Sequence, residues 1–285
     1  MASKAYGHGS YRFYQRTLAF LRTRLLGAVT MPALIGAAVA AADGAFHRLR
    51  FLLILAGLAA AELLNLLGSD YHWARNPDNS EPRLPGNPVL PARVLPPERV
   101  PLVLVPIALA GLGVLLYFTF TVGIGVLAFM LAAGLIGALY VFSPFDYAFL
   151  YTAFVPPLIS GGVYLAMSGR LLGEAFAAGV PITLISLGVI LGYRVMCVRE
   201  AAAYRRSRAV VLAVYGMAAV LVILYVPAGI LPPSGLAALA PILGFSWLFA
   251  RLSRRERRDA VPATAAGVLM HTATCLVLAA AIVWT

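Results

Sequence analysis

The stretch AELLNLLGSDYHWARNPDNSEPRLPGNPVLPARVLPPER, residues 61–99, is a polar segment with a long apolar block on each side. Acidic and amide side chains at its start are followed by arginines and prolines. Carboxylates beside arginines at a membrane boundary can together hold a divalent cation and a phosphate group. We therefore expect this stretch to form one half of an active site. Its polar residues of interest are Glu62, Asn65, Asp70, Asp78, Glu81, Arg75, Arg83, Arg93 and Arg99.

Apolar residues dominate the 285-residue chain. They make up 61% of it and only 12% of the residues are charged, whereas a soluble domain has about 25% charged residues. The apolar residues form blocks near the ~20 residues that cross a bilayer, and the short alternating strands of an outer-membrane barrel are not visible. The sequence predicts an all-α polytopic membrane bundle of about nine transmembrane helices, in a single domain over 1–285. The expected spans are 25–43, 49–68, 100–118, 121–142, 148–167, 174–193, 209–227, 234–250 and 261–283.

Basic residues give the chain a net charge of +11. Every lysine and arginine except Arg48, Arg50 and Arg170 falls on one side of the predicted bundle. This is the positive-inside bias of membrane proteins, so the charge indicates topology and not a nucleic-acid partner. We expect an integral protein of a bacterial inner or plasma membrane, with the N-terminus in the cytoplasm and the C-terminus outside. The cytoplasmic segments are the basic N-terminal segment 1–24, the active-site loops 69–99 and 193–208, and the loop 251–259.

Glu62 lies well inside the second predicted span. An ionisable side chain at a helix centre costs ~2.5–3.5 kcal/mol on insertion scales, so it should face a polar cavity. Helical periodicity puts Glu62, Asn65 and Ser69 on one face of the helix. If the helix continues, Asp70 lies near the same face at the water boundary. The acidic residues further along either fold back toward this face or are ordinary solvated loop charges.

The second polar stretch, YRVMCVREAAAYRRSR at residues 193–208, has a single carboxylate, Glu200. The hydroxyl groups of Tyr193 and Tyr204 could hydrogen-bond a phosphate group. The arginines of this stretch either pair with phosphate or serve only as topology charges. They are Arg194, Arg199, Arg205, Arg206 and Arg208.

The order of apolar blocks and polar loops resembles the UbiA superfamily of intramembrane prenyltransferases. Within it, the chain looks closest to the branch that prenylates dihydroxynaphthoate in menaquinone synthesis. The stretches that carry the resemblance are RTRLLGAVTMPALIGAAVAA (22–41), AAELLNLLGSDY (60–71), LYVFSPFDYAFLYTAFVPPLISGGVYLAMSG (139–169), YRVMCVREAAAYRRSRAVVLAVYG (193–216) and PATAAGVLMHTATCLVLAAAIV (262–283). They cover nearly the whole chain, and His271 matches a family position in the last of them.

The first aspartate motif departs from the family pattern. Asn65 and Asp70 stand one residue further apart than in the family, and Trp73 occupies the next aspartate position. Asp78 could replace a later aspartate of the motif.

The second aspartate motif also departs from it. Glu200 takes the first aspartate position, Tyr204 takes the second, and Ser207 with Arg208 replaces a Gly-Lys pair. The resemblance therefore implies a reduced version of the family's metal site.

The resemblance implies a reaction that ionises the allylic C–O bond of a polyprenyl diphosphate, with Mg²⁺ and arginines stabilising the leaving group. The carbocation then alkylates an electron-rich acceptor in a dry cavity open to the cytoplasmic side. The metal ligands implied are Asp70, Asp78 and Glu200, and the catalytic residues are Asn65, Asp70 and Glu200. The substrate-binding residues implied are Glu62, Arg75, Arg83, Tyr140, Tyr147, Tyr151, Arg194, Arg199 and Tyr204, with Phe142 and Phe154 as further candidates for the aromatic lining.

Two other functions remain open. The chain could be a non-catalytic UbiA-like protein that binds an isoprenoid or quinone lipid, or that serves as a subunit. It could also be a small-molecule transporter, although it shows no inverted repeat and no broken helices in matching halves. Dependence of diphosphate release on Mg²⁺ separates the enzyme from the lipid-binding protein.

Overall fold

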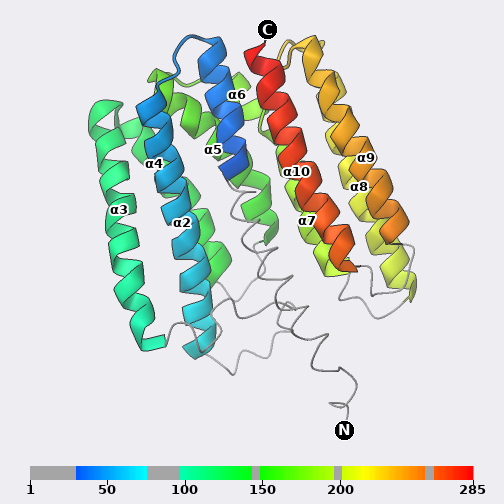
Figure 1. The fold of residues 1–285 in the computed structure, drawn as a ribbon, viewed down its shortest axis with the longest axis horizontal. Coiled ribbons are helices and arrows are strands. Elements are labelled where there is room, and N and C mark those ends of the chain that lie inside the picture. Colours follow the sequence, from blue (N-terminus) through cyan, green and yellow to red (C-terminus); the bar gives the residue numbers. More distant parts are fainter. Residues whose placement is uncertain (1–29, 76–96, 143–147, 196–200, 254–259, 285) are drawn as a thin grey trace.

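The structure is a computed structural model that describes residues 30–75, 97–142, 148–195, 201–253 and 260–284. These residues form helices and turns, with no strand among them, so the predicted all-α class is confirmed. The bundle is shown in Figure 1. The helices are the first helix Thr30–Ala42, α2 (Arg48–Arg75), α3 (Val100–Thr121), α4 (Ile124–Phe142), α5 (Ala148–Ser168), α6 (Gly173–Ala177), α7 (Val180–Val195), α8 (Ala201–Tyr225), α9 (Leu239–Leu252) and α10 (Ala260–Val283), with 3-10 turns η1 (Pro97–Arg99) and η2 (Pro233–Ala238).

Successive long helices run up and down the bundle in alternation (Figure 1). One end of the bundle, which we call the junction end, holds the end of α2 at Arg75, the end of α7 at Val195 and the start of α8 at Ala201. The opposite end holds the turn around Asp43 and the turn around Arg170. Both polar stretches of the sequence therefore border the same end of the bundle.

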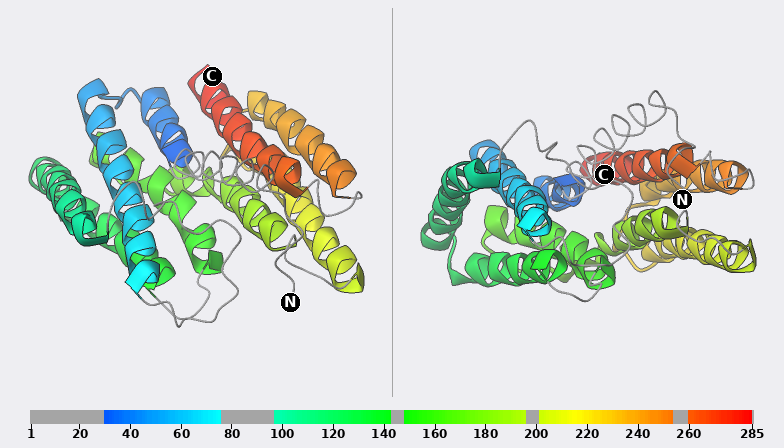
Figure 2. Two further views of the ribbon diagram at one scale, coloured as in Figure 1. Left: turned by 60° about the horizontal axis from the view of Figure 1, so that its bottom comes forward. Right: turned by 90° about the horizontal axis from the view of Figure 1, so that it is seen from below.

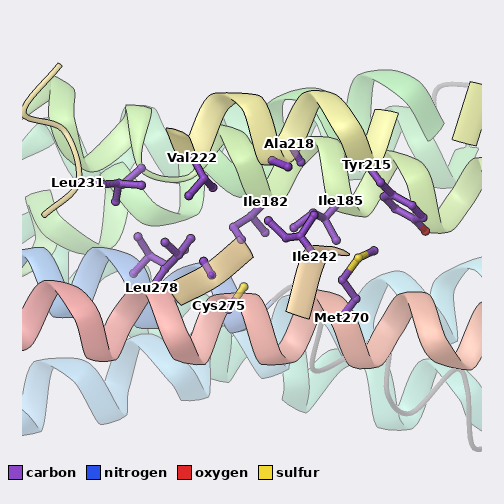
Figure 3. Close-up of a cluster of buried hydrophobic side chains, with 14 of the residues drawn as sticks. Ile182, Ile185, Tyr215, Ala218, Val222, Leu231, Ile242, Met270, Cys275 and Leu278 are labelled. Carbon is purple, nitrogen blue, oxygen red and sulfur yellow. The ribbon is translucent and has the colours of Figure 1, made fainter. Parts of the chain in front are cut away.

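Two buried apolar clusters hold the helices together. One joins α7, α8, α9 and α10 and is shown in Figure 3, where Ile182, Tyr215 and Met270 lie among the buried side chains between these helices. The other joins α2, α3, α4, α5 and α6, with Tyr164 of α5 among its buried members. The first helix contributes to both clusters, because Ala33 packs in the second and Ile35 in the first. The first helix thus connects the two halves of the bundle.

The outward faces of the helices are apolar. On α3, for example, Leu102 is 72% exposed and Phe120 is 85% exposed, which is costly in water but suits contact with lipid chains. Five helical segments among the described residues are long and apolar enough to cross a membrane, and three shorter ones are also apolar. Each span expected from the sequence contains a described helix, and the total of nine crossings stays a prediction.

At the opposite end, polar side chains connect the start of α2 and the loop after the first helix to α5. Arg50 donates from Nη1 to the carbonyl oxygen of Met167 at 2.9 Å, and the Tyr164 hydroxyl donates to the carboxylate of Asp43. The last carbonyls of a helix have no partner within the helix. The arginine therefore satisfies a free carbonyl group at the C-terminal end of α5.

Both stretches expected to be loops are partly helical. α2 continues through Asp70 to Arg75, because the first proline of the stretch is Pro77 and nothing before it blocks the helix. α8 begins at Ala201, where three consecutive alanines give the highest helix propensity available. The first polar residues after each apolar block thus lie on helices, which hold the backbone more rigidly than a loop.

Candidate functional site

The candidate site begins on α2. Glu62 is 7% exposed, so its carboxyl group lies inside the bundle and not against lipid. Asn65 and Asp70 follow on the same helix, and Arg75 is its last residue. Because α2 runs toward the junction end, these residues are ordered from the interior of the bundle to its surface.

The second part of the candidate site lies at the junction of α7 and α8. Arg194 is in the last turn of α7, and Tyr204 is in the first turn of α8. Residues predicted for substrate or metal binding that fall outside the described residues are Asp78, Arg83, Tyr147, Arg199 and Glu200. In the sequence, Glu200 directly precedes Ala201, the first residue of α8.

The predicted aromatic lining lies on α4 and α5, at the same end. Tyr140 is near the end of α4 and Tyr151 is near the start of α5. Only the backbone is described at Asn65, Asp70, Arg75, Tyr140, Tyr151 and Arg194. The central cavity therefore stays a prediction, as does the role of each of these side chains.

Tyr204 and Arg208 meet the end of α9. The Tyr204 hydroxyl donates to the carbonyl oxygen of Ser253 at 2.9 Å. Arg208 donates from Nε to the Ser253 hydroxyl at 2.7 Å and from Nη2 to the carbonyl oxygen of Ala250 at 3.0 Å. These bonds satisfy carbonyl groups at the C-terminal end of α9, which have no partner within the helix. Sequence reasoning missed this contact, because no pattern pairs residues about 45 positions apart in an all-helical chain.

We expect Tyr204→Phe to lower the free energy of unfolding by about 1 kcal/mol, because a hydrogen bond between α8 and α9 is lost. Unfolding in mixed detergent micelles measures this change. Tyr117→Phe is the matched control, because Tyr117 is exposed on α3 and far from this contact. Equal stability of Tyr204→Phe and the parent protein would show that the contact contributes nothing.

His271 and Thr274 are buried polar residues on α10, with 1% and 0% of their surfaces exposed. Neither ring nitrogen of His271, nor the hydroxyl of Thr274, has a hydrogen-bond partner among the described residues. Gly267 lies one turn before His271 on the same face of α10. A Cβ added at Gly267 would lie 3.1 Å from the hydroxyl oxygen of Tyr215 in α8, so this face of α10 closely approaches α8. These groups thus lie on the face of α10 that is turned toward α7 and α8. The sequence singled out His271, but Thr274 carries no signal that distinguishes it from a packing threonine.

We expect Thr274→Val to leave the free energy of unfolding unchanged or raise it by about 1 kcal/mol. Valine has nearly the shape of threonine and removes a buried hydroxyl group that has no hydrogen-bond partner within the described part of the chain. Thermal unfolding of the two proteins in the same detergent makes the comparison. A loss of stability of 1 kcal/mol or more would mean that a segment outside the described residues bonds to the hydroxyl.

A magnesium ion needs several oxygen ligands around one point. The described residues contain no group of three or more His, Cys, Asp or Glu side chains that could hold a metal ion. The ligand set implied by the resemblance would therefore depend on Asp78 and Glu200, which lie outside the described residues, together with Asp70.

Comparisons with known proteins bear on the fold. No protein-family model matches the sequence, and a search of curated proteins found no match. Among solved structures, the chain is similar to a digeranylgeranylglyceryl phosphate synthase in membranes, with a TM-score of 0.60 and 13% sequence identity. The similarity covers 94% of this chain and 98% of the other one. The chain therefore shares the fold of a digeranylgeranylglyceryl phosphate synthase in membranes, and its described part has five helical segments long and apolar enough to span a membrane.

Proposed function

We propose that this chain is a membrane prenyltransferase. In this proposal it transfers a polyprenyl group from an isoprenoid diphosphate to an aromatic or other lipophilic acceptor, of the kind used in quinone synthesis. The observation that carries the proposal is the fold, which matches a digeranylgeranylglyceryl phosphate synthase over nearly the full length of both chains. The name of that synthase's product contains two geranylgeranyl groups on glyceryl phosphate, so its chemistry is the attachment of prenyl chains.

The arrangement of the two polar stretches supports the proposal. Asp70 lies on α2 within five residues of its end, and Glu200 immediately precedes α8. The described helix ends next to these two positions, the end of α2 and the start of α8, both belong to the junction end (Figure 1). Acidic groups from two distant parts of the sequence can therefore approach one diphosphate, as a shared site requires.

The proposed roles follow from the chemistry of the leaving group. Asp70, Asp78 and Glu200 would hold Mg²⁺, which when bound supplies positive charge to the diphosphate. Asn65 would orient the diphosphate through its side-chain amide, with the buried Glu62 one turn deeper. The guanidinium groups that would pair with the phosphate oxygens are those of Arg75, Arg83, Arg194 and Arg199.

The reaction then proceeds in the apolar interior. The allylic C–O bond breaks, and its electron pair leaves with the diphosphate. A carbon of the acceptor attacks the carbocation, and the acceptor loses a proton to restore its aromatic ring. Aromatic side chains at Tyr140, Tyr147 and Tyr151 would line this space and help to exclude water, which would otherwise capture the cation.

The proposal is tested by diphosphate release. Purified full-length protein in lipid nanodiscs is given radiolabelled geranylgeranyl diphosphate and an aromatic acid, with and without Mg²⁺. We expect release of diphosphate and a labelled lipophilic product only when both acceptor and Mg²⁺ are present. Tight binding of the labelled lipid without any product, across donors and acceptors, would instead identify an isoprenoid-binding protein without catalysis.

A further inference from the structure

His271 and Cys275 on α10 form a buried pair that the proposed reaction does not use. They are four residues apart, so helical geometry places both on one face of α10, one turn from each other. The two residues are 1% and 0% exposed. Leu269 and Leu276 mark the outward face of the same helix, where these leucines are 45% and 51% exposed. The pair therefore faces the interior of the bundle and not the lipid.

The surroundings of this pair are apolar. In Figure 2, α10 lies in one layer of the bundle between the first helix and α9, whereas α7 and α8 lie in the other layer. Gly267, one turn before His271, closely approaches Val189 of α7. Figure 3 shows Cys275 among the buried side chains of the apolar cluster that α10 shares with α7, α8 and α9. Any group bound by this pair would thus be enclosed by packed helices.

The imidazole ring of His271 is the unusual member of this cluster. Within the described part of the chain neither ring nitrogen has a hydrogen-bond partner, and each has almost no surface that a water molecule could touch. A buried polar group without a partner costs on the order of 1–3 kcal/mol. A water molecule does not offset this cost, because there is no room for one beside the nitrogens. A metal ion can do so, because metal–ligand bonds of about 2.0–2.3 Å are much shorter than van der Waals contacts and need little space.

The chemistry of the pair selects the kind of ion. Thiolate and imidazole are ligands that suit Cu(I), which is stable with as few as two ligands. The described residues provide no group of three or more His, Cys, Asp or Glu side chains, whereas a structural zinc ion takes four ligands. Charge also favours Cu(I), because one thiolate and one monovalent ion are together neutral. A divalent ion would leave an uncompensated charge in the apolar interior, which is costly.

We propose that His271 and Cys275 bind one Cu(I) ion inside the bundle. The thiol of Cys275 releases its proton as the sulfur–copper bond forms, and a ring nitrogen of His271 donates its lone pair to the ion. Copper keeps its oxidation state in this step. The inference does not depend on the proposed prenyl transfer, because neither residue is among those proposed to hold the diphosphate, its Mg²⁺ or the acceptor.

Competition for copper tests this proposal. Purified full-length protein in detergent is titrated, without oxygen, into Cu(I) held by bicinchoninate. The loss of the coloured copper–bicinchoninate complex measures the copper that the protein takes. We expect the parent protein to take one equivalent of Cu(I), and X-ray absorption of the bound copper to show one sulfur and one nitrogen ligand. Failure of the parent protein to take copper from bicinchoninate, or bound copper without a sulfur ligand, would overturn the proposal.

The chain offers a matched control for each ligand. Cys275→Ala and His271→Leu should each weaken Cu(I) binding by more than about 100-fold, because even residues that only support a metal ligand usually contribute 10- to 100-fold. Cys197→Ala removes the other cysteine of the chain, and His47→Leu removes an exposed histidine at the opposite end of the bundle. Both controls should bind Cu(I) like the parent protein.

Thermal unfolding in the same detergent separates loss of a ligand from loss of the fold. Cu(I) should raise the unfolding temperature of the parent protein and of both controls, because an ion that binds only the folded state stabilises it. It should not raise that of Cys275→Ala or His271→Leu, each of which should still unfold in one transition. Unchanged binding in either of these two variants, or an equal loss in Cys197→Ala, would show that copper binds elsewhere and would contradict the assignment.

Discussion

Asp70→Asn should slow diphosphate release by about 100- to 1000-fold, the loss that follows removal of one preorganised group that stabilises developing charge. Asparagine keeps the shape of the side chain and its place on α2. It removes the negative charge that a magnesium ligand needs. The initial rate of Mg²⁺-dependent diphosphate release at saturating geranylgeranyl diphosphate measures the effect.

Further variants test whether Asp70 and Glu200 act in one site. Glu200→Gln should cause a comparable loss, and the double variant with Asp70→Asn should lose little more, because groups that act as one site are not additive. Glu174→Gln is the matched control, since Glu174 is an exposed carboxylate at the opposite end of the bundle and should keep the parent rate. A parent rate in Asp70→Asn would contradict the assignment of Asp70 to the metal site while leaving prenyl transfer open.

The helices of this fold are largely predictable from the sequence, because each is an apolar block between polar segments. The exact ends of the helices cannot be predicted in this way, as α2 and α8 show. α2 extends into the polar stretch through Arg75, and α8 begins inside the second one at Ala201. Hydropathy reports where a chain is buried in lipid, whereas the end of a helix depends on prolines, propensity and capping contacts.

The residues that fasten the helices to one another could not be read from the sequence. The sequence predicts Arg50 to be a basic residue on the outer side of the membrane, and in the structure its side chain bonds the C-terminal end of α5. From the sequence, Arg208 is a candidate for phosphate binding or for a topology charge, and in the structure its guanidinium group bonds the end of α9. A basic residue near a helix end has the same appearance in sequence whether it meets a lipid, a ligand or a carbonyl group. Only the packing of the partner helix distinguishes these cases.

The sequence predicts at which end of the bundle the candidate site lies, and the site itself stays a prediction. The two polar stretches border the junction end, as the count of membrane crossings between them requires. The distance between the carboxyl groups of Asp70 and Glu200 depends on how the helices tilt and rotate. Such details are set by contacts between neighbouring helices and are not encoded in local periodicity.

Gly36→Ala should lower the free energy of unfolding by about 3 kcal/mol, at the upper end of the usual cost of overpacking. The first helix crosses α5 so closely that a Cβ at Gly36 would overlap the carbonyl oxygen of Ser160. Backbone cannot move aside as the end of a side chain can, so the two helices would have to separate. Separation would also weaken the packing of Ala33 and Ala37, which are buried beside Gly36 in the second apolar cluster.

Gly113→Ala is the matched control for Gly36→Ala, because Gly113 also lies within a helix but has open space where a Cβ would be. Alanine there should be neutral or stabilise the protein by about 0.5–1 kcal/mol, since it favours the helix over glycine. Thermal unfolding of both variants in the same detergent, followed by size-exclusion chromatography, measures the difference. If Gly36→Ala unfolds at the same temperature as Gly113→Ala, the first helix does not approach α5 as closely as the structure has it. In that case its role in joining the two halves of the bundle would have to rest on the apolar side chains alone.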